Sequence, residues 1–125
     1  MDSGKHKILL VEDDPFMTTL LANGLAEAGF EAVLAKSGED AIQKFSEIKP
    51  SALLIDIMLP GKSGLEALAE IRKLEGGDNI PAIILSNIEE AGYVREAERL
   101  RAAAYLVKAN MQVSDIVAKV KEVLK

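Results

Sequence analysis

The stretch LLIDIMLP (residues 53–60) places one carboxylate, Asp56, in the middle of a run of apolar side chains. An ionised carboxylate in apolar surroundings is costly unless a cation or hydrogen-bond donors pair with it. Either Asp56 lies where the apolar run ends, or a cationic side chain from elsewhere in the chain neutralises it. The choice between these alternatives depends on the elements that surround this run.

The composition is typical of a single globular domain over residues 1–125, since 49% of the residues are hydrophobic and 28% are charged. A chain of this length buries roughly two thirds of its unfolded surface, so it can fold without a disulfide or a structural metal. The absence of Cys agrees with this and excludes thiol chemistry. The net charge of −5 disfavours direct binding of nucleic acid. Because the sequence contains neither a leader-like apolar segment nor a membrane-length one, we expect a cytoplasmic protein that makes no membrane contact.

Five short apolar runs predict β-strands. Three of them, near 8–11, 53–55 and 82–85, are continuous rather than alternating, which is typical of parallel strands covered by helices on both faces. The runs are KILLV (7–11), FEAVLA (30–35), SALLID (51–56), PAIILS (81–86) and AYLVK (104–108). Helical patterns separate them, so the sequence predicts an α/β fold with a doubly wound, five-stranded parallel sheet.

The helix starts share one signal, a polar side chain that can accept a hydrogen bond from the free amides of the first turn. A last helix begins near Val113, where apolar residues recur at helical spacing, and Gly29 ends the first helix. The predicted caps are Asp14 before Pro15, Ser37 before a helix over about 39–48, Ser63 with Glu66 for a helix over about 64–74, and Asn87 with Glu90 for a fourth helix.

Polar residues follow four of the strands at their carboxyl ends: Glu12, Asp13 and Asp14, then Asp56, Ser86 and Lys108. In the common doubly wound order 2-1-3-4-5 these strands are neighbours, so the side chains meet at one edge of the sheet. Crowded carboxylates raise one another's pKa unless a cation neutralises them. A hard ion such as Mg²⁺, with Lys108 as a second positive charge, would do so.

Four segments in order, ILLVEDD, LLIDIMLPGKSG, IILSN and YLVKA, resemble the receiver domain of two-component response regulators over essentially the whole chain. The resemblance implies a flavodoxin-like (βα)5 fold and a role in phosphorelay signal transduction rather than an enzyme. It implies that Asp56 accepts a phosphoryl group from a sensor histidine kinase or a phosphotransfer protein.

The same resemblance assigns roles around Asp56. Mg²⁺ would be held by Asp56 and Asp13, by the backbone carbonyl of Met58, and through water by Glu12. Ser86 and Lys108 would contact the phosphoryl oxygens, and Ser86 and Tyr105 would change conformation as the switch. A downstream partner would bind the surface formed by the fourth helix, the fifth strand and the fifth helix.

The sequence departs from the family pattern at three positions. Ala109 follows Lys108, where the family usually has a proline after a cis bond; a cis bond before a non-proline residue costs about 2.5–4 kcal/mol, so we expect trans. Ser63 replaces the usual aspartate before the glycine that opens the third helix, and it can still cap that helix. Arg101 lies where a glycine is common after the fourth helix.

Three other functions are weaker interpretations of the same sequence. An FMN carrier of this fold needs a first loop that binds phosphate, and Glu12-Asp13-Asp14 would repel one. A haloacid-dehalogenase-type phosphatase needs a second acid two residues after the nucleophile, where Met58 lies. A degenerate receiver that binds partners without phosphorylation is disfavoured by the complete set of acids, serine and lysine.

Overall fold

One parallel sheet forms the centre of the computed structural model, which describes residues 5–125; residues 1–4 of the expected domain lie outside the described residues. The strand order is β2-β1-β3-β4-β5, as predicted. The strands are β1 (Lys7–Val11), β2 (Glu31–Ala35), β3 (Ala52–Ile55), β4 (Ala82–Ser86) and β5 (Ala104–Val107).

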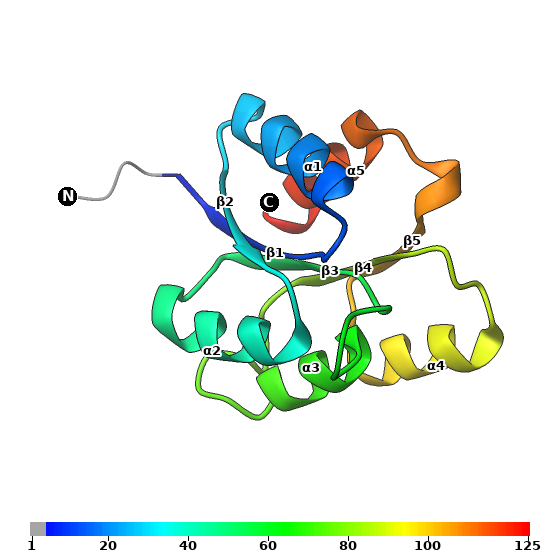
Figure 1. The fold of residues 1–125 in the computed structure, drawn as a ribbon. Coiled ribbons are helices and arrows are strands. Elements are labelled where there is room, and N and C mark those ends of the chain that lie inside the picture. The colour runs from blue at the N-terminus through cyan, green and yellow to red at the C-terminus, as the bar shows by residue number, and fades with distance from the viewer. Residues whose placement is uncertain (1–4) are drawn as a thin grey trace.

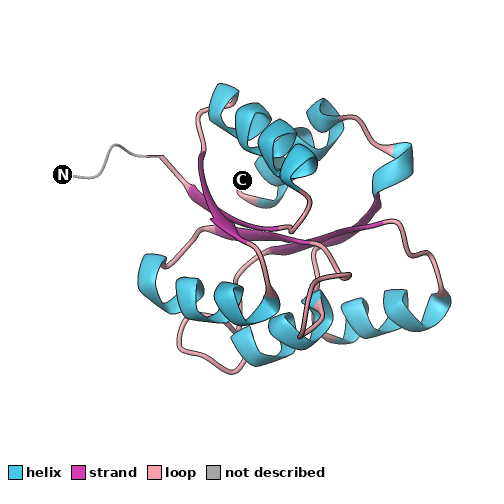
Figure 2. Ribbon diagram, in the orientation of Figure 1, coloured by secondary structure: helices cyan, strands magenta, loops and turns pink. Residues whose placement is uncertain are grey.

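Helices cover both faces of this sheet: α1 and α5 lie on one face, and α2, α3 and α4 lie on the other (Figure 1). Figure 2 shows the strands as one layer between the two helical layers. Within residues 5–125, no helix is both long enough and apolar enough to cross a membrane. The helices are α1 (Pro15–Glu27), α2 (Gly38–Ile48), α3 (Gly64–Ile71), α4 (Ala91–Arg99), the 3₁₀ turn η1 (Lys108–Asn110) and α5 (Val113–Val123).

The continuous apolar strands supply two hydrophobic cores at once. Alternate side chains of β1 point to opposite faces, so Leu9 packs in the core beneath α2, α3 and α4, whereas Ile8 and Leu10 pack beneath α1 and α5. In β3, Leu53 and Leu54 divide between the two cores in the same way. A polar side chain on either face of these strands would be buried, which explains why the runs do not alternate.

Three of the predicted helix caps are confirmed. The Asp14 side chain accepts a hydrogen bond from the Phe16 amide, and the Ser37 side chain accepts one from the Asp40 amide. Ser63 and Glu66 form the reciprocal capping box at α3.

The cap predicted at Asn87 is wrong. Helix α4 begins later, with Glu90 as its N-cap, and Glu90 makes no side-chain capping bond. The Asn87 side chain instead accepts a hydrogen bond from the Ala109 amide at 2.9 Å. A tertiary contact across the sheet edge therefore replaces the local one.

The third helix is also shorter than predicted, because it ends at Ile71. The next amides bond three residues back, Lys73 to Glu70 and Leu74 to Ile71, each at 3.0 Å. Such bonds tighten the chain out of α-helical geometry.

Arg101 adopts the backbone conformation that a glycine would favour, with φ of 63°. It follows the last turn of α4, where the Ala102 amide bonds to the Ala97 carbonyl at 3.0 Å and the Arg101 amide bonds to the Glu98 carbonyl at 2.9 Å. This is the left-handed helix end that glycine usually occupies. The turn thus keeps its geometry with an arginine in it.

Arg72 connects two loops that are far apart in the sequence. Its guanidinium is buried and donates to the carbonyls of Ile80 at 2.6 Å and Gly77 at 3.0 Å in the segment after α3. It also donates to the carbonyls of Leu100 at 2.9 Å and Arg101 at 3.0 Å after α4. Burial, and secondarily the charge of Arg101, lower the pKa of Arg72.

Replacing Arg72 with Met should lower the free energy of unfolding by about 2–4 kcal/mol, because its buried bonds to the carbonyls of Gly77 and Ile80 and its partly buried bonds after α4 are lost at once. Urea unfolding of the purified protein measures the loss. Arg99→Met is the matched control, since Arg99 is exposed, and it should change stability by less than about 0.5 kcal/mol. Equal midpoints for the two variants would contradict this role of Arg72.

Candidate functional site

The ends of four strands place the predicted site residues at one edge of the sheet. Val11 at the end of β1 lies in register with Ile55 at the end of β3. The Asp56 amide continues this pairing by donating to the Val11 carbonyl at 3.0 Å. Since the strands are parallel, the residues that follow them, Glu12 and Asp56, emerge side by side.

Both alternatives raised by the LLIDIMLP stretch hold for Asp56. The strand ends at Ile55, and Asp56 is the first residue beyond it, with 7% of its surface exposed. Its Oδ2 lies 2.9 Å from Lys108 Nζ, and its Oδ1 accepts a weak hydrogen bond from the Met58 amide at 3.4 Å. The buried carboxylate therefore has a cationic partner, supplied by the end of β5.

Gly64 lets the start of α3 pack directly on this strand end. A Cβ atom at position 64 would lie 2.0 Å from the backbone oxygen of Asp56. The Gly64 amide donates to the Ile57 carbonyl at 2.9 Å, which closes the loop between β3 and α3. A side chain at this position would push α3 away from the site.

Lys108 also pairs with Glu12, whose Oε1 lies 2.8 Å from Lys108 Nζ. Burial raises the pKa of Glu12, although hydrogen bonds from Lys108 and from the Asp14 amide act in the opposite direction. For Lys108, burial acts to lower the pKa, but its hydrogen bonds and charge interactions with Glu12 and Asp56 together raise the pKa above its ordinary value. The two buried carboxylates thus share one ammonium group.

A cluster of carboxylate oxygens that can bind a cation lies beside this pair. One oxygen each of Glu12, Asp13 and Asp56 fall within 4.8 Å of one another. Asp13 is exposed, so an ion could reach it from solvent. Asp14 lies next in sequence, but its side chain caps α1 through the Phe16 amide at 3.0 Å. Oxygen donors in this arrangement fit a hard divalent cation such as Mg²⁺.

Ser86 and Tyr105 lie together beside the segment that follows β4. Ser86 is fully buried, and its hydroxyl accepts from the Ile88 amide at 3.2 Å. The Tyr105 hydroxyl donates to the carbonyl of the same residue, Ile88. Burial raises the pKa of Tyr105, and its interaction with Ser86 offsets this in part. Both predicted switch residues therefore hold the backbone of Ile88.

The bond between Lys108 and Ala109 is trans, as expected for a non-proline residue. Asn87 binds the Ala109 amide immediately after Lys108, so it helps to hold the turn that carries the lysine. Sequence reasoning missed this role. The available signal is an amide side chain directly after a buried strand, a position that also predicts a local helix cap.

Comparison with known proteins identifies the family. The family model for the response regulator receiver domain matches residues 8–121. This chain is a member of the response regulator receiver domain family.

Individual relatives agree with this assignment. The receiver is 35% identical to the chemotaxis protein CheY of Listeria monocytogenes over 103 residues, which cover 82% of this chain and 85% of that protein. Among solved structures, it is similar to a putative response regulator from Chloroflexus aurantiacus, with a TM-score of 0.88, 29% identity and coverage of 96% of this chain and 98% of that one. It is also similar to the BeF3-activated N-terminal receiver domain of Klebsiella pneumoniae RstA, with a TM-score of 0.84, 28% identity and coverage of 95% and 98%.

Replacing Lys108 with Met should raise the pKa of Glu12 further in the metal-free receiver, because Lys108 is the main group that lowers it. Carboxyl ¹³C chemical shifts of Glu12, followed against pH, measure this change. Lys119→Met is the control, since Lys119 pairs with Glu122 on α5. Superimposable Glu12 titration curves for wild type and Lys108→Met would show that the ion pair does not act on Glu12.

The raised pKa of Glu12 in the wild-type protein also sets how the contribution of Glu12 to stability depends on pH. Because the folded pKa of Glu12 lies above its unfolded value, the folded state binds the proton more tightly. The contribution of Glu12 to stability is therefore complete below the unfolded pKa and is lost as pH rises through the folded pKa.

Proposed function

We propose that this receiver accepts a phosphoryl group on the carboxylate of Asp56, from the phosphohistidine of a sensor histidine kinase or a phosphotransfer protein. The observation that carries the proposal is the setting of Asp56: a nearly buried carboxylate at a strand end, paired with Lys108 and clustered with Glu12 and Asp13. The similar BeF3-activated receiver domain of Klebsiella pneumoniae RstA supports the proposal, since beryllofluoride (BeF3) mimics a phosphoryl group.

In the proposed reaction an oxygen of Asp56 attacks the phosphorus atom. The phosphorus–nitrogen bond of the phosphohistidine breaks, its electron pair stays on the imidazole, and an acyl phosphate forms on the receiver. Because the nucleophile and the phosphoryl group are both anionic, the site has to compensate their charge. In this proposal Lys108 contacts the phosphoryl oxygens as they arrive, and its distance of 2.9 Å from Asp56 Oδ2 supports that role.

Mg²⁺ fits the same site. We propose that it is held by carboxylate oxygens of Asp13 and Asp56 and by the backbone carbonyl of Met58, with Glu12 acting through a water molecule. When bound, the ion neutralises charge between the Asp56 carboxylate and the phosphoryl group. Glu12 is buried, whereas Asp13 is exposed to solvent. This difference agrees with an indirect role for Glu12 and direct binding of the ion by Asp13.

Ser86 and Tyr105 are the proposed switch. A phosphoryl oxygen on Asp56 would accept the proton of the Ser86 hydroxyl and draw that hydroxyl toward Asp56, away from the Ile88 amide from which it now accepts. The Ile88 carbonyl is the acceptor for Tyr105, so a shift of this backbone also releases Tyr105. New contacts that exist in one state only can bias such an equilibrium. The proposed consequence is a change in the surface of α4, β5 and α5 that a downstream partner binds.

Acetyl phosphate with Mg²⁺ should add one phosphoryl group to the wild-type receiver and none to Asp56→Asn, because the amide cannot form the acyl phosphate. Intact-mass spectrometry measures the adduct. Asp78→Asn is the control, since Asp78 is exposed and pairs with Arg101; it should be phosphorylated like the wild type. An adduct on Asp56→Asn would overturn the assignment of the phosphorylated residue.

Asp13→Asn should weaken Mg²⁺ binding by about tenfold or more, because a carboxylate ligand and its charge are lost together. Asp14→Asn is the matched control: its side chain caps α1, and Asn caps a helix as well as Asp does. Isothermal titration of the two variants with Mg²⁺ compares them. Equal losses of affinity would mean that the metal ligands are misassigned.

A further inference from the structure

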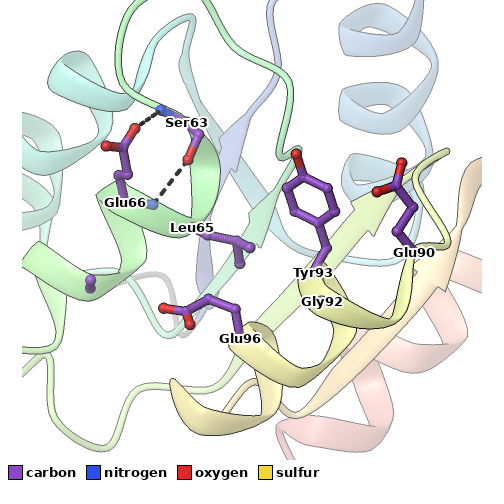
Figure 3. Close-up of a pocket in the computed structure, with 8 residues that line it drawn as sticks. Ser63, Leu65, Glu66, Glu90, Gly92, Tyr93 and Glu96 are labelled. Carbon is purple, nitrogen blue, oxygen red and sulfur yellow. Dashed lines mark hydrogen bonds between the residues drawn. The ribbon is translucent and has the colours of Figure 1, made fainter.

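A groove of about 450 Å³ lies between α3 and α4, in the helical layer that also contains α2 (Figure 3). Its apolar surface comes from both helices. Leu65 of α3 is nearly buried and forms part of the floor together with Ala69. Tyr93 of α4 is 38% exposed, which makes it one of few large apolar side chains that the described chain presents to solvent. In Figure 3 the Leu65 side chain and the Tyr93 ring face the same space from opposite walls.

Three glutamates line the groove beside this apolar surface: Glu66 from α3, whose carboxylate is turned toward the Ser63 amide (Figure 3), and Glu90 and Glu96 from α4. Glu66 uses one oxygen to accept from the Ser63 amide, and Glu96 uses one oxygen to bind Arg99. Across residues 5–125, no hydrogen bond or ion pair engages the Glu90 side chain, which also leaves the start of α4 uncapped. Each carboxylate therefore keeps at least one oxygen that can accept from a ligand.

We propose that this α3–α4 groove is a docking site for an amphipathic helix of a partner protein, with an apolar ridge flanked by lysine or arginine. The apolar floor and the exposed Tyr93 offer the contact that the ridge of such a helix buries. The three rim carboxylates select positive charge at its sides and repel the phosphates of nucleic acids and anionic lipids. The net charge of −5 adds to this preference.

The groove is distinct from the surface of α4, β5 and α5 proposed above as the output surface. It uses the side of α4 that faces α3, whereas β5 belongs to the sheet and α5 covers the opposite face of that sheet (Figure 1). Binding in the groove does not require phosphorylation of Asp56, so the two proposals can fail separately.

The test uses a fluorescein-labelled helical peptide built from leucine and lysine, titrated with the unphosphorylated receiver and followed by fluorescence anisotropy. Glu66→Gln with Glu90→Gln should weaken binding by about tenfold, because two rim charges are removed. Gln at position 66 preserves the capping box of α3. Tyr93→Ala should weaken binding by about tenfold or more, because the exposed apolar contact is lost.

Glu27→Gln with Glu47→Gln is the matched control. These two glutamates are exposed on α1 and α2 and do not line the groove. The pair removes the same net charge and should change the affinity by less than about twofold. Failure of the leucine–lysine peptide to bind the wild type would overturn the proposal. It would also be overturned if the control pair weakened binding as much as the groove pair, or if a leucine–glutamate peptide bound equally well.

Discussion

The site depends on one ammonium group shared by two buried carboxylates. Lys108 Nζ lies 2.8 Å from Glu12 Oε1 and 2.9 Å from Asp56 Oδ2, so the ends of β1, β3 and β5 are joined through a single charge. Without that cation, two carboxylates with 3% and 7% exposure would repel one another in a poorly solvated setting. The strand order makes the contact possible, because β1 and β3 are neighbours and only β4 separates β3 from β5.

Two loops connect this charged edge to the outer surface. One leads from Asp56 to α3, where Gly64 packs against the backbone of Asp56. The other leads from Ser86 to α4, and Ser86 and Tyr105 both bind the backbone of Ile88 within it. At the opposite end of α4, Arg72 ties the following turn to the segment after α3. Helix α4 is therefore anchored by Arg72 at its end, whereas at its start the N-cap residue Glu90 makes no side-chain capping bond.

Much of the fold could be predicted because its signals are local. A continuous apolar run such as 82–85 has to be buried on both faces, and a cap such as Ser63 with Glu66 involves residues three positions apart. The site residues Asp56 and Lys108 could also be anticipated, since parallel strands bring their carboxyl ends to one edge. The cap predicted at Asn87 is wrong because its side chain accepts a hydrogen bond from the distant Ala109 amide instead of from a nearby helix amide. Sequence spacing does not reveal such a distant partner.

The sequence by itself determined where the apolar strands and most helix starts lie, because these depend on neighbouring residues. It also determined which acids, serine and lysine follow the strands, because that depends only on which side chains are present. Only the tertiary structure decided how those groups pair. Lys108 contacts Glu12 as well as Asp56, Arg72 binds carbonyls of two separate loops, and α3 and α4 form an acidic groove between them. These contacts join residues far apart in the chain, and their energies depend on burial and distance, which exist only once the sheet and its helices have packed.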